Sequence, residues 1–553
     1  MATISRTVPT APAAPRRTAV LDDAHVGDIR GALGTIAVDD FAPRTGLPAK
    51  LKTLLAIVGP GLIVMCGDND AGAFSTYGQA GQDYGTRLLW TLLLLVPVLY
   101  VNQEMVLRLG AVTGVGHARL ILERFGKFWG AFSVIDLFIL NALTIVTEFI
   151  GITLAAGYLG VPKLVAVVLA AGVIIAAAFT GSFRRFERIA VSFCAGSLLL
   201  IPLFLLVHPS GAQMAHGFLV PGLPGGSGQM GTVMLLIIGI VGTTVAPWQL
   251  FFQQSYVIDK RITPRFMRYE KADLWIGIVV VVLGAAALMG ATAAAFAGTR
   301  TGSSFTDAGG LARGLAAYAG RAVGVVFAVA LLDAAIIGAF AVSLSSAYAI
   351  GDVLGLKHSL HRGFGQAKGF YAVYAALICG AAAIVLIPRA PLGLMTEGVQ
   401  VLAGVLLPSA TVFLLLLCND RAVLGPWVNR RATNLFTSAV VAVLVTLSVV
   451  LTASVLFPGI TGRQITEIIG VCAAASVVAG AWALVRARRS FGFGVGVPVD
   501  RTERDSWRMP PLAMLSKPVM STGRRLGLTA LRSYLAIAMI MVIVKLVQVA
   551  LAH

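Results

Sequence analysis

The sequence predicts an all-α integral membrane protein, and composition, apolar runs and charge distribution support this class. Of the 553 residues, 57% are hydrophobic and 12% are charged, and the mean hydropathy is +0.86. A soluble domain carries about twice this fraction of charged residues. The apolar residues form continuous runs that are apolar all round rather than stripes along one helix face. Examples are Leu88–Val101, Leu164–Ala178, Ile189–Val207 and Val440–Leu456.

Runs of this kind predict about twelve spans within residues 51–489, and one more at Tyr534–Leu551. A bilayer core of about 30 Å needs about 20 apolar residues per helix. We therefore expect a transmembrane domain at residues 51–489 with about twelve helices. Residues 490–532 are expected to form a basic cytoplasmic linker. Residues 533–553 would add a transmembrane or interfacial helix, which could contact a second copy of the chain or another partner.

Lysine and arginine are concentrated in alternate loops of the predicted topology. The net charge is +18, and the basic residues precede the first span and follow the second, fourth, sixth, eighth, tenth and twelfth. They include Lys50, Lys52, Arg108, Arg124, Arg184, Arg185, Lys260, Arg261, Lys357, Arg430 and Arg488. Arg300, Arg313 and Arg321 depart from the alternation. The positive-inside rule then places the N-terminus in the cytoplasm of a multi-pass cell-membrane protein. The basic excess reflects topology and lipid headgroups rather than nucleic acid.

Residues 1–50 contain no apolar run that could serve as a signal peptide. They are rich in Ala, Thr, Pro and Arg. A segment of this composition cannot bury enough apolar surface to fold alone. We therefore expect a disordered cytoplasmic tail.

Two spans contain helix-breaking residues. The first span passes through Gly59-Pro60-Gly61 and then meets Gly67-Asp68-Asn69-Asp70-Ala71-Gly72. Such a segment is expected to unwind, which hydrocarbon tolerates only where the freed backbone lines a cavity or a bound ion. In the sixth span, Pro247 removes a backbone donor and frees a carbonyl one turn earlier. Breaks in spans one and six predict two inverted five-helix repeats with a midplane substrate site. A simple kink is the alternative, and it is harder to exclude for span six.

Several short motifs, in order and at matching spacing, resemble the NRAMP family of divalent metal transporters. They are Gly59-Pro60-Gly61, Asp70 nine residues later, Gln79-Ala80-Gly81, Arg108–Gly114, Gly181–Glu187 and Thr243–Pro247. The resemblance implies a LeuT-type fold with helices 1 and 6 broken, followed by two or three extra C-terminal helices. It also implies that Asp70 is the carboxylate of the family's metal motif and that Gln400 matches the family's span-ten glutamine.

The departures from the family pattern concern the metal ligands. The family's metal-binding Asn corresponds to Ala73, and its methionine corresponds to Ala246. The span-six histidines correspond to Trp248 and Gln253, and only Glu148 remains of the span-three acid pair. A thioether favours softer transition ions, so its loss indicates a wider and harder site. The chain is therefore similar to the divergent NRAMP-related magnesium transporters.

We expect Asp70 to be the central ligand of a divalent cation, directly or through water. A charged residue at mid-membrane costs about 2.5–3.5 kcal/mol on the insertion scale, so an idle Asp70 is unfavourable. The further candidate ligands are Asp68, Asn69, the freed carbonyl of Thr243, and the side chains of Thr244 and Gln249. Asp68 could instead cap a half-helix. The amides of Asn69 and Gln249 could bond neighbouring helices, and the hydroxyls of Thr243 and Thr244 could bond their own helix. Candidate proton or gating residues are Glu148, Asp333 and Gln400.

The predicted function is a secondary transporter or facilitator that moves Mg²⁺ or Mn²⁺ into the cytoplasm by alternating access. No other cofactor is expected, because the ion is the cargo. A symporter of a small organic substrate on the same fold is the first alternative, although two acids at the first break disfavour it. A non-transporting membrane sensor would need a larger soluble output domain. An enzyme is not expected, because neither H-E-x-x-H nor G-x-S-x-G occurs.

Overall fold

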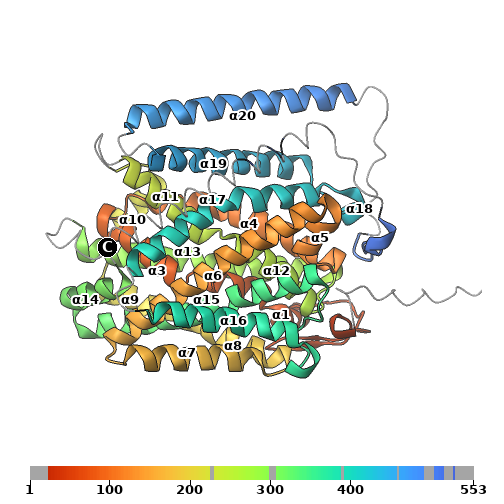
Figure 1. Ribbon diagram of the computed structural model, residues 1–553, viewed down its shortest axis with the longest axis horizontal. Coiled ribbons are helices and arrows are strands. Elements are labelled where there is room, and N and C mark those ends of the chain that lie inside the picture. The colour runs from red at the N-terminus through yellow and green to blue at the C-terminus, as the bar shows by residue number, and fades with distance from the viewer. Residues whose placement is uncertain are drawn as a thin grey trace, which may run out of the picture.

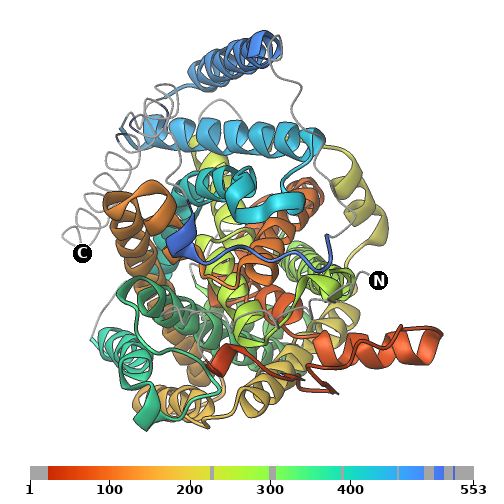
Figure 2. The same cartoon turned by 90° about the vertical axis from the view of Figure 1, so that its right-hand side faces the viewer.

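The computed structural model describes residues 23–224, 230–297, 307–387, 392–456, 460–490 and 504–515, with residues 527, 529 and 533. Most of these residues belong to α-helices that run side by side along one long axis (Figure 1). The end-on view shows central helices enclosed by others, with α19 and α20 outermost on one side (Figure 2). This architecture confirms the all-α prediction.

The elements follow one another in a single connected bundle. The first half contains β1 (Ile29–Arg30), β2 (Thr35–Ile36), α1 (Leu47–Ile57), α2 (Pro60–Cys66), α3 (Ala71–Tyr84), α4 (Leu89–Thr113), α5 (His117–Phe125), α6 (Lys127–Tyr158), α7 (Lys163–Ala178), α8 (Phe183–Gly196), α9 (Leu200–Val207) and α10 (Gly211–Leu219). The second half contains α11 (Met230–Thr244), α12 (Pro247–Asp259), α13 (Met267–Phe296), α14 (Ala308–Ala319), α15 (Arg321–Leu354), α16 (Lys368–Val385), α17 (Leu392–Cys418), α18 (Arg421–Leu424), α19 (Arg431–Leu456) and α20 (Gly462–Ser490).

Within the described ranges, ten helices are long and apolar enough to cross a membrane. Two further segments complete the topology predicted from the sequence. The helix α7 is apolar but only 16 residues long. The first span is divided into α1, α2 and α3, and α1 meets α2 at an angle of 53°. Together these segments correspond to the predicted spans up to α20, whereas the predicted C-terminal helix at 534–551 lies outside the described residues.

Both predicted helix breaks are present. The helix α2 ends at Cys66 and α3 begins at Ala71, so Gly67–Asp70 connect the two half-helices. The helix α11 ends at Thr244 and α12 begins at Pro247. Proline is favoured in the first turn of a helix because its missing N–H has no partner there, so Pro247 starts α12 rather than kinking it. The two pieces still form one membrane-length segment, Thr232–Asp259, so a simple kink in span six stays an alternative.

The basic loops gather at one end of the bundle, on the right in Figure 1, where α1, α5 and α18 lie. Ion pairs connect these loops: Arg124 Nη2 lies 2.6 Å from Asp420 Oδ2, and Lys271 Nζ lies 2.9 Å from Glu104 Oε1. We call this end the basic end. The helices α10 and α14 lie at the opposite end (Figure 1). The grouping agrees with the alternation of basic loops along the sequence.

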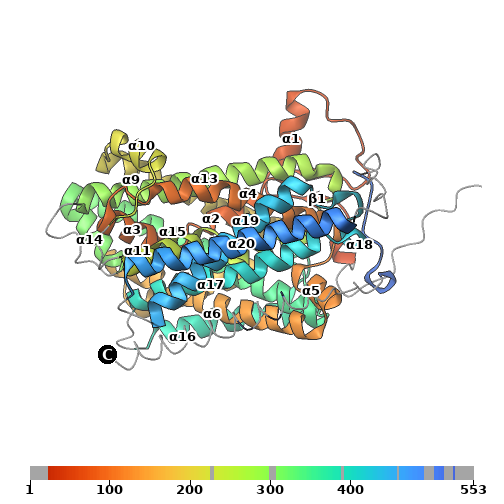
Figure 3. The same ribbon diagram turned by 90° about the horizontal axis from the view of Figure 1, so that it is seen from above.

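The prediction of a disordered tail over residues 1–50 is wrong for residues 23–50. Residues 23–36 form one 3-10 turn and a two-stranded antiparallel ribbon, in which Ile29 pairs with Ile36. Ile29, Ala32 and Ile36 are buried against the bundle. The helix α1 then projects outward from the basic end (Figure 3). The composition did not reveal this order because the partners that bury these residues lie far away in the sequence. Residues 1–22 lie outside the described residues.

Part of the predicted linker at 490–532 packs on the basic end. In residues 504–515, Arg508 Nη1 donates to Ala111 O at 2.5 Å, at the end of α4. The Arg504 guanidinium lies 3.6 Å from the ring centroid of Trp427. Trp507 covers Gly425, where an added Cβ would lie 2.4 Å from the indole. The segment therefore ties α4 to the connection between α17 and α19.

Candidate metal site

Asp70 stands at the N-cap of α3, directly after the first break. Its Oδ1 accepts a hydrogen bond from Ala73 N at 2.8 Å. A carboxylate at this position satisfies one of the free N–H groups and interacts favourably with the helix dipole. The side chain is buried, with 4% of its surface exposed. The break therefore fixes Asp70 at the centre of the bundle and leaves its Oδ2 for another partner.

Glu148 of α6 lies beside Asp70. Its Oε2 accepts a hydrogen bond from Ala71 N, the residue after Asp70, at 3.1 Å. Gly338 of α15 allows this approach, because a Cβ there would lie 2.9 Å from Glu148 and 3.0 Å from Asp70 Cβ. The two carboxyl groups are therefore neighbours at the first break.

Asp68 faces the second break. Gln249 Nε2, in the first turn of α12, donates to Asp68 Oδ1 and also to Thr244 O at 3.3 Å. The amide oxygen is also hydrogen-bonded, because Gln249 Oε1 accepts from Gln103 Nε2 of α4 at 2.7 Å. Gln249 thus presents its NH₂ group to a carboxylate rather than its oxygen to an ion. This is the helix-bonding alternative that the sequence left open.

The two threonines of the sixth span have different surroundings. Thr244 Oγ1 donates to Ile240 O at 2.5 Å and lies 2.7 Å from Tyr77 Oη of α3. Thr243 Oγ1 is buried without a hydrogen-bond partner. Thr244 therefore bonds within the protein, and Thr243 keeps a free hydroxyl next to the break.

Asn69 and Gln400 border the site from opposite sides. Asn69 Nδ2 donates to Val281 O of α13 at 3.3 Å, and its Oδ1 has no partner. Gln400 of α17 lies over Gly72, where an added Cβ would be 1.8 Å from Gln400 Nε2. A larger residue at this position would therefore displace the Gln400 amide. An added Cβ at Gly67 would be in ordinary contact with the Trp248 ring, at 3.4 Å.

Asp333 is the one candidate that the structure places outside this group. It is half-buried on α15, where its carboxyl group lies against Gly196 at the end of α8. A Cβ added to that glycine would lie 2.1 Å from Asp333 Cγ. None of the contacts described above joins Asp333 to Asp68, Asp70 or Glu148. The sequence could not show this, because helical phase decides which face of α15 Asp333 occupies.

Three buried polar residues were not among the sequence candidates for the site. Gln103 and Tyr77 bond to Gln249 and Thr244, and Gln253 follows one turn after Gln249 in α12. All three are fully buried, and neither amide atom of Gln253 has a partner. A polar side chain in an apolar span is costly unless it is paired. That signal alone could have identified Gln103, which interrupts the apolar run of α4.

Several of the buried polar atoms without hydrogen-bond partners belong to residues at or near the two breaks. They are Asp68 Oδ2, Asn69 Oδ1, Gln103 Oε1, Glu148 Oε1, Thr243 Oγ1, both amide atoms of Gln253, and Gln400 Nε2. Such atoms can be satisfied by a bound ion or by water. Across the described ranges, no three His, Cys, Asp or Glu side chains converge as they do in a fully protein-ligated metal centre.

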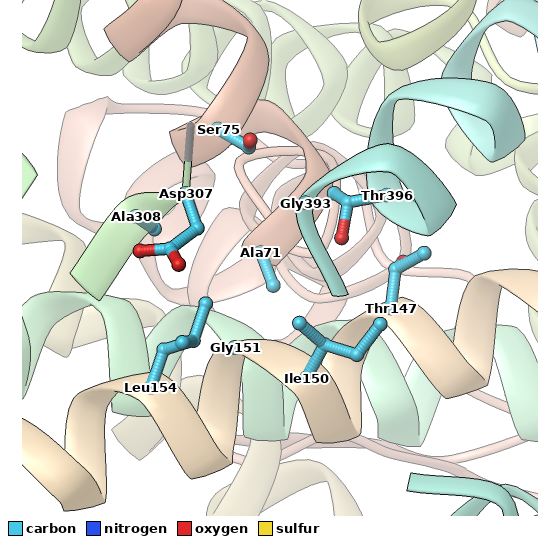
Figure 4. A pocket seen from close by; sticks show the side chains of 10 residues that line it. All are labelled: Ala71, Ser75, Thr147, Ile150, Gly151, Leu154, Asp307, Ala308, Gly393 and Thr396. Carbon is cyan, nitrogen blue, oxygen red and sulfur yellow. The ribbon is translucent and has the colours of Figure 1, made fainter. Parts of the chain in front are cut away.

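A small pocket of about 10 Å³, room for about one water, is lined by Ala71, the residue that follows Asp70. Figure 4 shows Ala71 and Ser75 of α3, Thr147 and Gly151 of α6, Asp307 before α14 and Thr396 of α17 around it. Ala71 and Gly151 are in contact, since an added Cβ on Gly151 would lie 2.4 Å from Ala71 Cβ. The pocket therefore reaches the residue next to Asp70 and Glu148.

The broken helices, the buried Asp70 and the neighbouring acid are accompanied by a family match. Residues 61–454 match the model of the Nramp family, described as natural resistance-associated macrophage protein-like. The chain belongs to the Nramp family. A divalent metal cation transporter MntH from Ralstonia nicotianae is 31% identical over 404 residues, covering 69% of this chain and 87% of that protein. The MntH of Burkholderia ambifaria is 28% identical over 431 residues, covering 73% and 89%.

The structural comparison confirms the LeuT-type fold predicted for this Nramp protein. A crystal structure of the Eremococcus coleocola manganese transporter superposes with a TM-score of 0.61. The match covers 83% of this chain and 98% of the other at 21% sequence identity. The ordered N-terminal residues 23–46 and the segment 504–515 both lie outside the range that the family model matches.

Proposed function

We propose that this Nramp protein is a secondary transporter or facilitator that moves a divalent metal cation across the membrane. The observation that carries the proposal is the buried Asp70 at the first break, surrounded by polar atoms without partners. The family relatives named above are divalent metal cation transporters, and none is an enzyme. An organic anion would instead use the helix N-termini at the breaks; Asp70 already occupies that of α3, whereas that of α12 has no side-chain cap.

The cargo is proposed to be Mg²⁺ or Mn²⁺. Ala246 supplies no sulfur at the start of α12, and Ala73 supplies no amide in α3. Oxygen ligands without a thioether favour harder ions. Mg²⁺ usually keeps several waters and is held by one or two carboxylates, which matches a site where few protein ligands converge. A partly hydrated ion could use the unpartnered oxygens of Asp68, Asn69 and Thr243 through its waters.

The proposed roles divide between ligands and positioning residues. Asp70 is the central ligand, directly or through water. Asp68 contributes its Oδ2, while Gln249 holds its Oδ1. Glu148 is proposed to take the proton that Asp70 releases when the cation binds. Gln400 covers the site from α17 and is proposed to move when the ion enters.

Transport is proposed to be inward, with the basic end and the N-terminus in the cytoplasm. Positively charged loops are retained on the cytoplasmic side during insertion. The pocket of Figure 4, which Ala71 and Asp307 line, is proposed to lie on the path from the outside to Asp70. Lys260, Glu187 and Asp273 at the basic end are fully buried, so this end is closed in the structure.

The test is uptake of Mg²⁺, Mn²⁺ and Ca²⁺ into proteoliposomes by the parent protein, Asp70→Asn and Asp333→Asn. Asp70→Asn should abolish uptake, because it removes the central charge while keeping the shape. Asp333→Asn is the matched control, since it removes a membrane carboxylate outside the site, and it should retain most uptake. Unchanged uptake by well-folded Asp70→Asn would overturn the proposed site. No uptake of any divalent ion by the parent protein would overturn the function.

A further inference from the structure

Residues 23–36 form an ordered segment at the basic end that contacts three different helices. We call these residues the N-terminal clamp. They lie outside residues 61–454, the range of the family match. Their position matters because α1 and α2 form the inner half of the broken first span, which must move when that end opens.

The clamp is bonded to the start of α8. Ala32 N donates to Glu187 Oε2 at 2.6 Å, and Arg188 Nε donates to Ala32 O at 3.1 Å. Both backbone groups of one clamp residue are therefore paired with consecutive residues of α8. Glu187 is completely buried, so its bond to the clamp is not weakened by competing water.

The clamp also packs in close contact with α1. An added Cβ on Gly31 would be 2.0 Å from Ala56 O, and one on Gly34 would be 2.9 Å from Ala56 Cβ. The first of these neighbours is backbone, which cannot move aside. Gly31 is therefore required for the close approach of the clamp to the last turn of α1.

The third contact is with the end of α12. Arg261 donates from Nε and Nη2 to Ala24 O, at 2.9 and 2.8 Å, and from Nη1 to Asp28 O at 3.2 Å. His25 Nε2 lies 3.9 Å from Asp259 Oδ1. Two clamp residues are thus held by one guanidinium, next to the ion pair described below.

The corner between α1 and α2 is held by the same helices. Lys260 Nζ of the α12 end donates to Ile57 O at 2.6 Å and to Val58 O at 2.9 Å, and it lies 2.7 Å from Glu187 Oε1. Asp273 of α13 accepts from Gly61 N at 2.6 Å. Glu187 thus binds Lys260 with one oxygen and the clamp with the other. Moving α1 away from α8 and α12 requires these bonds to break together.

From this shared carboxylate we infer that the N-terminal clamp holds the inner half of the first span against α8 and α12, and so keeps the basic end closed. The inference goes beyond the proposed cargo, because it concerns which end is open rather than what is bound. Weakening the clamp should increase the population in which α1 and α2 have moved away. The clamp would thereby set how often the transporter opens toward the basic end.

The test is amide hydrogen exchange on the full-length protein in detergent, comparing the parent with Gly31→Val and Arg188→Gln. Gly31→Val dislodges the clamp from α1, and Arg188→Gln removes one bond from an exposed position of α8. Exchange in residues 47–62 should accelerate about tenfold in the first variant and severalfold in the second, because opening exposes those amides. Exchange in α19 should not change.

Gly365→Val is the matched control, because an added Cβ there meets nothing within 4 Å. It should leave exchange in residues 47–62 unchanged. If exchange rises in residues 23–36 but not in 47–62, the clamp does not hold the first span and the inference is overturned. Should Gly31→Val fail to fold, Arg188→Gln alone decides between these outcomes. The measurement uses no metal, so it is independent of whether the protein transports one.

Discussion

The amide of Gln249 links two parts of the site, since it accepts from Gln103 and donates to Asp68. If its role is to position Asp68, then Gln103→Leu and Gln249→Leu should each weaken ion affinity. A hydrogen bond to a charged group contributes about 1.5–3 kcal/mol, so the apparent affinity should fall roughly 10- to 150-fold. Because both residues act through Asp68, the double variant should lose little more than either single variant.

Uptake measured against ion concentration gives the apparent affinities of the three variants. Gln213→Leu, an exposed glutamine on α10, serves as the control and should behave like the parent protein. Full additivity of the two losses would mean that Gln249 and Gln103 act separately. A direct ligand role for Gln249 would then be favoured over the positioning role.

At the scale of the element, the start of α3 depends on Gly72. An alanine there would displace the amide of Gln400, although alanine favours a helix over glycine by up to about 1 kcal/mol. We therefore expect Gly72→Ala to lower ion uptake about tenfold while thermal stability stays the same or increases. Loss of uptake without loss of thermal stability would show that the substitution acts on the ion site and not on the fold.

The comparison variant for this prediction is Gly172→Ala on α7. Its added Cβ meets nothing within 4 Å, so only the helix propensity changes. It should retain uptake. Equal losses in Gly72→Ala and Gly172→Ala, or a large fall in the unfolding temperature of Gly72→Ala, would contradict the proposed contact with Gln400.

The helix breaks could be predicted from the sequence, whereas the clamp could not. The breaks at Gly67–Asp70 and before Pro247 were predictable because glycine, proline and carboxylates disfavour a helix locally. The clamp was not, because its order depends on Glu187 and Arg261, more than 150 residues away. Asp70 was placed correctly at the first break by its motif, whereas the roles of Gln249, Gln103 and Asp333 depend on which helix each one faces.

At the scale of the whole molecule, the energy source follows from the number of titratable groups along the bundle. The motif resemblance matches Trp248 and Gln253 to the family's span-six histidines and Ile145 to its span-three aspartate. Glu148 and Asp70 are neighbouring acids at the site, and the contacts described here give Asp333 no bond to either. The membrane potential alone supplies about 2.3 kcal/mol per charge per 100 mV, or about twice that for a divalent ion. We therefore expect weak or absent proton coupling.

Proteoliposomes with a pH-sensitive dye inside separate these two energy sources. With the potential clamped at zero by potassium and valinomycin, metal entry should continue down its gradient without acidifying the interior. With the potential set negative inside, the rate of metal entry should increase several-fold. Metal-dependent acidification at zero potential, lost in Glu148→Gln, would show instead that the Asp70–Glu148 pair passes its proton inward with each ion. The two acids would then form a complete coupling path without the family's histidines.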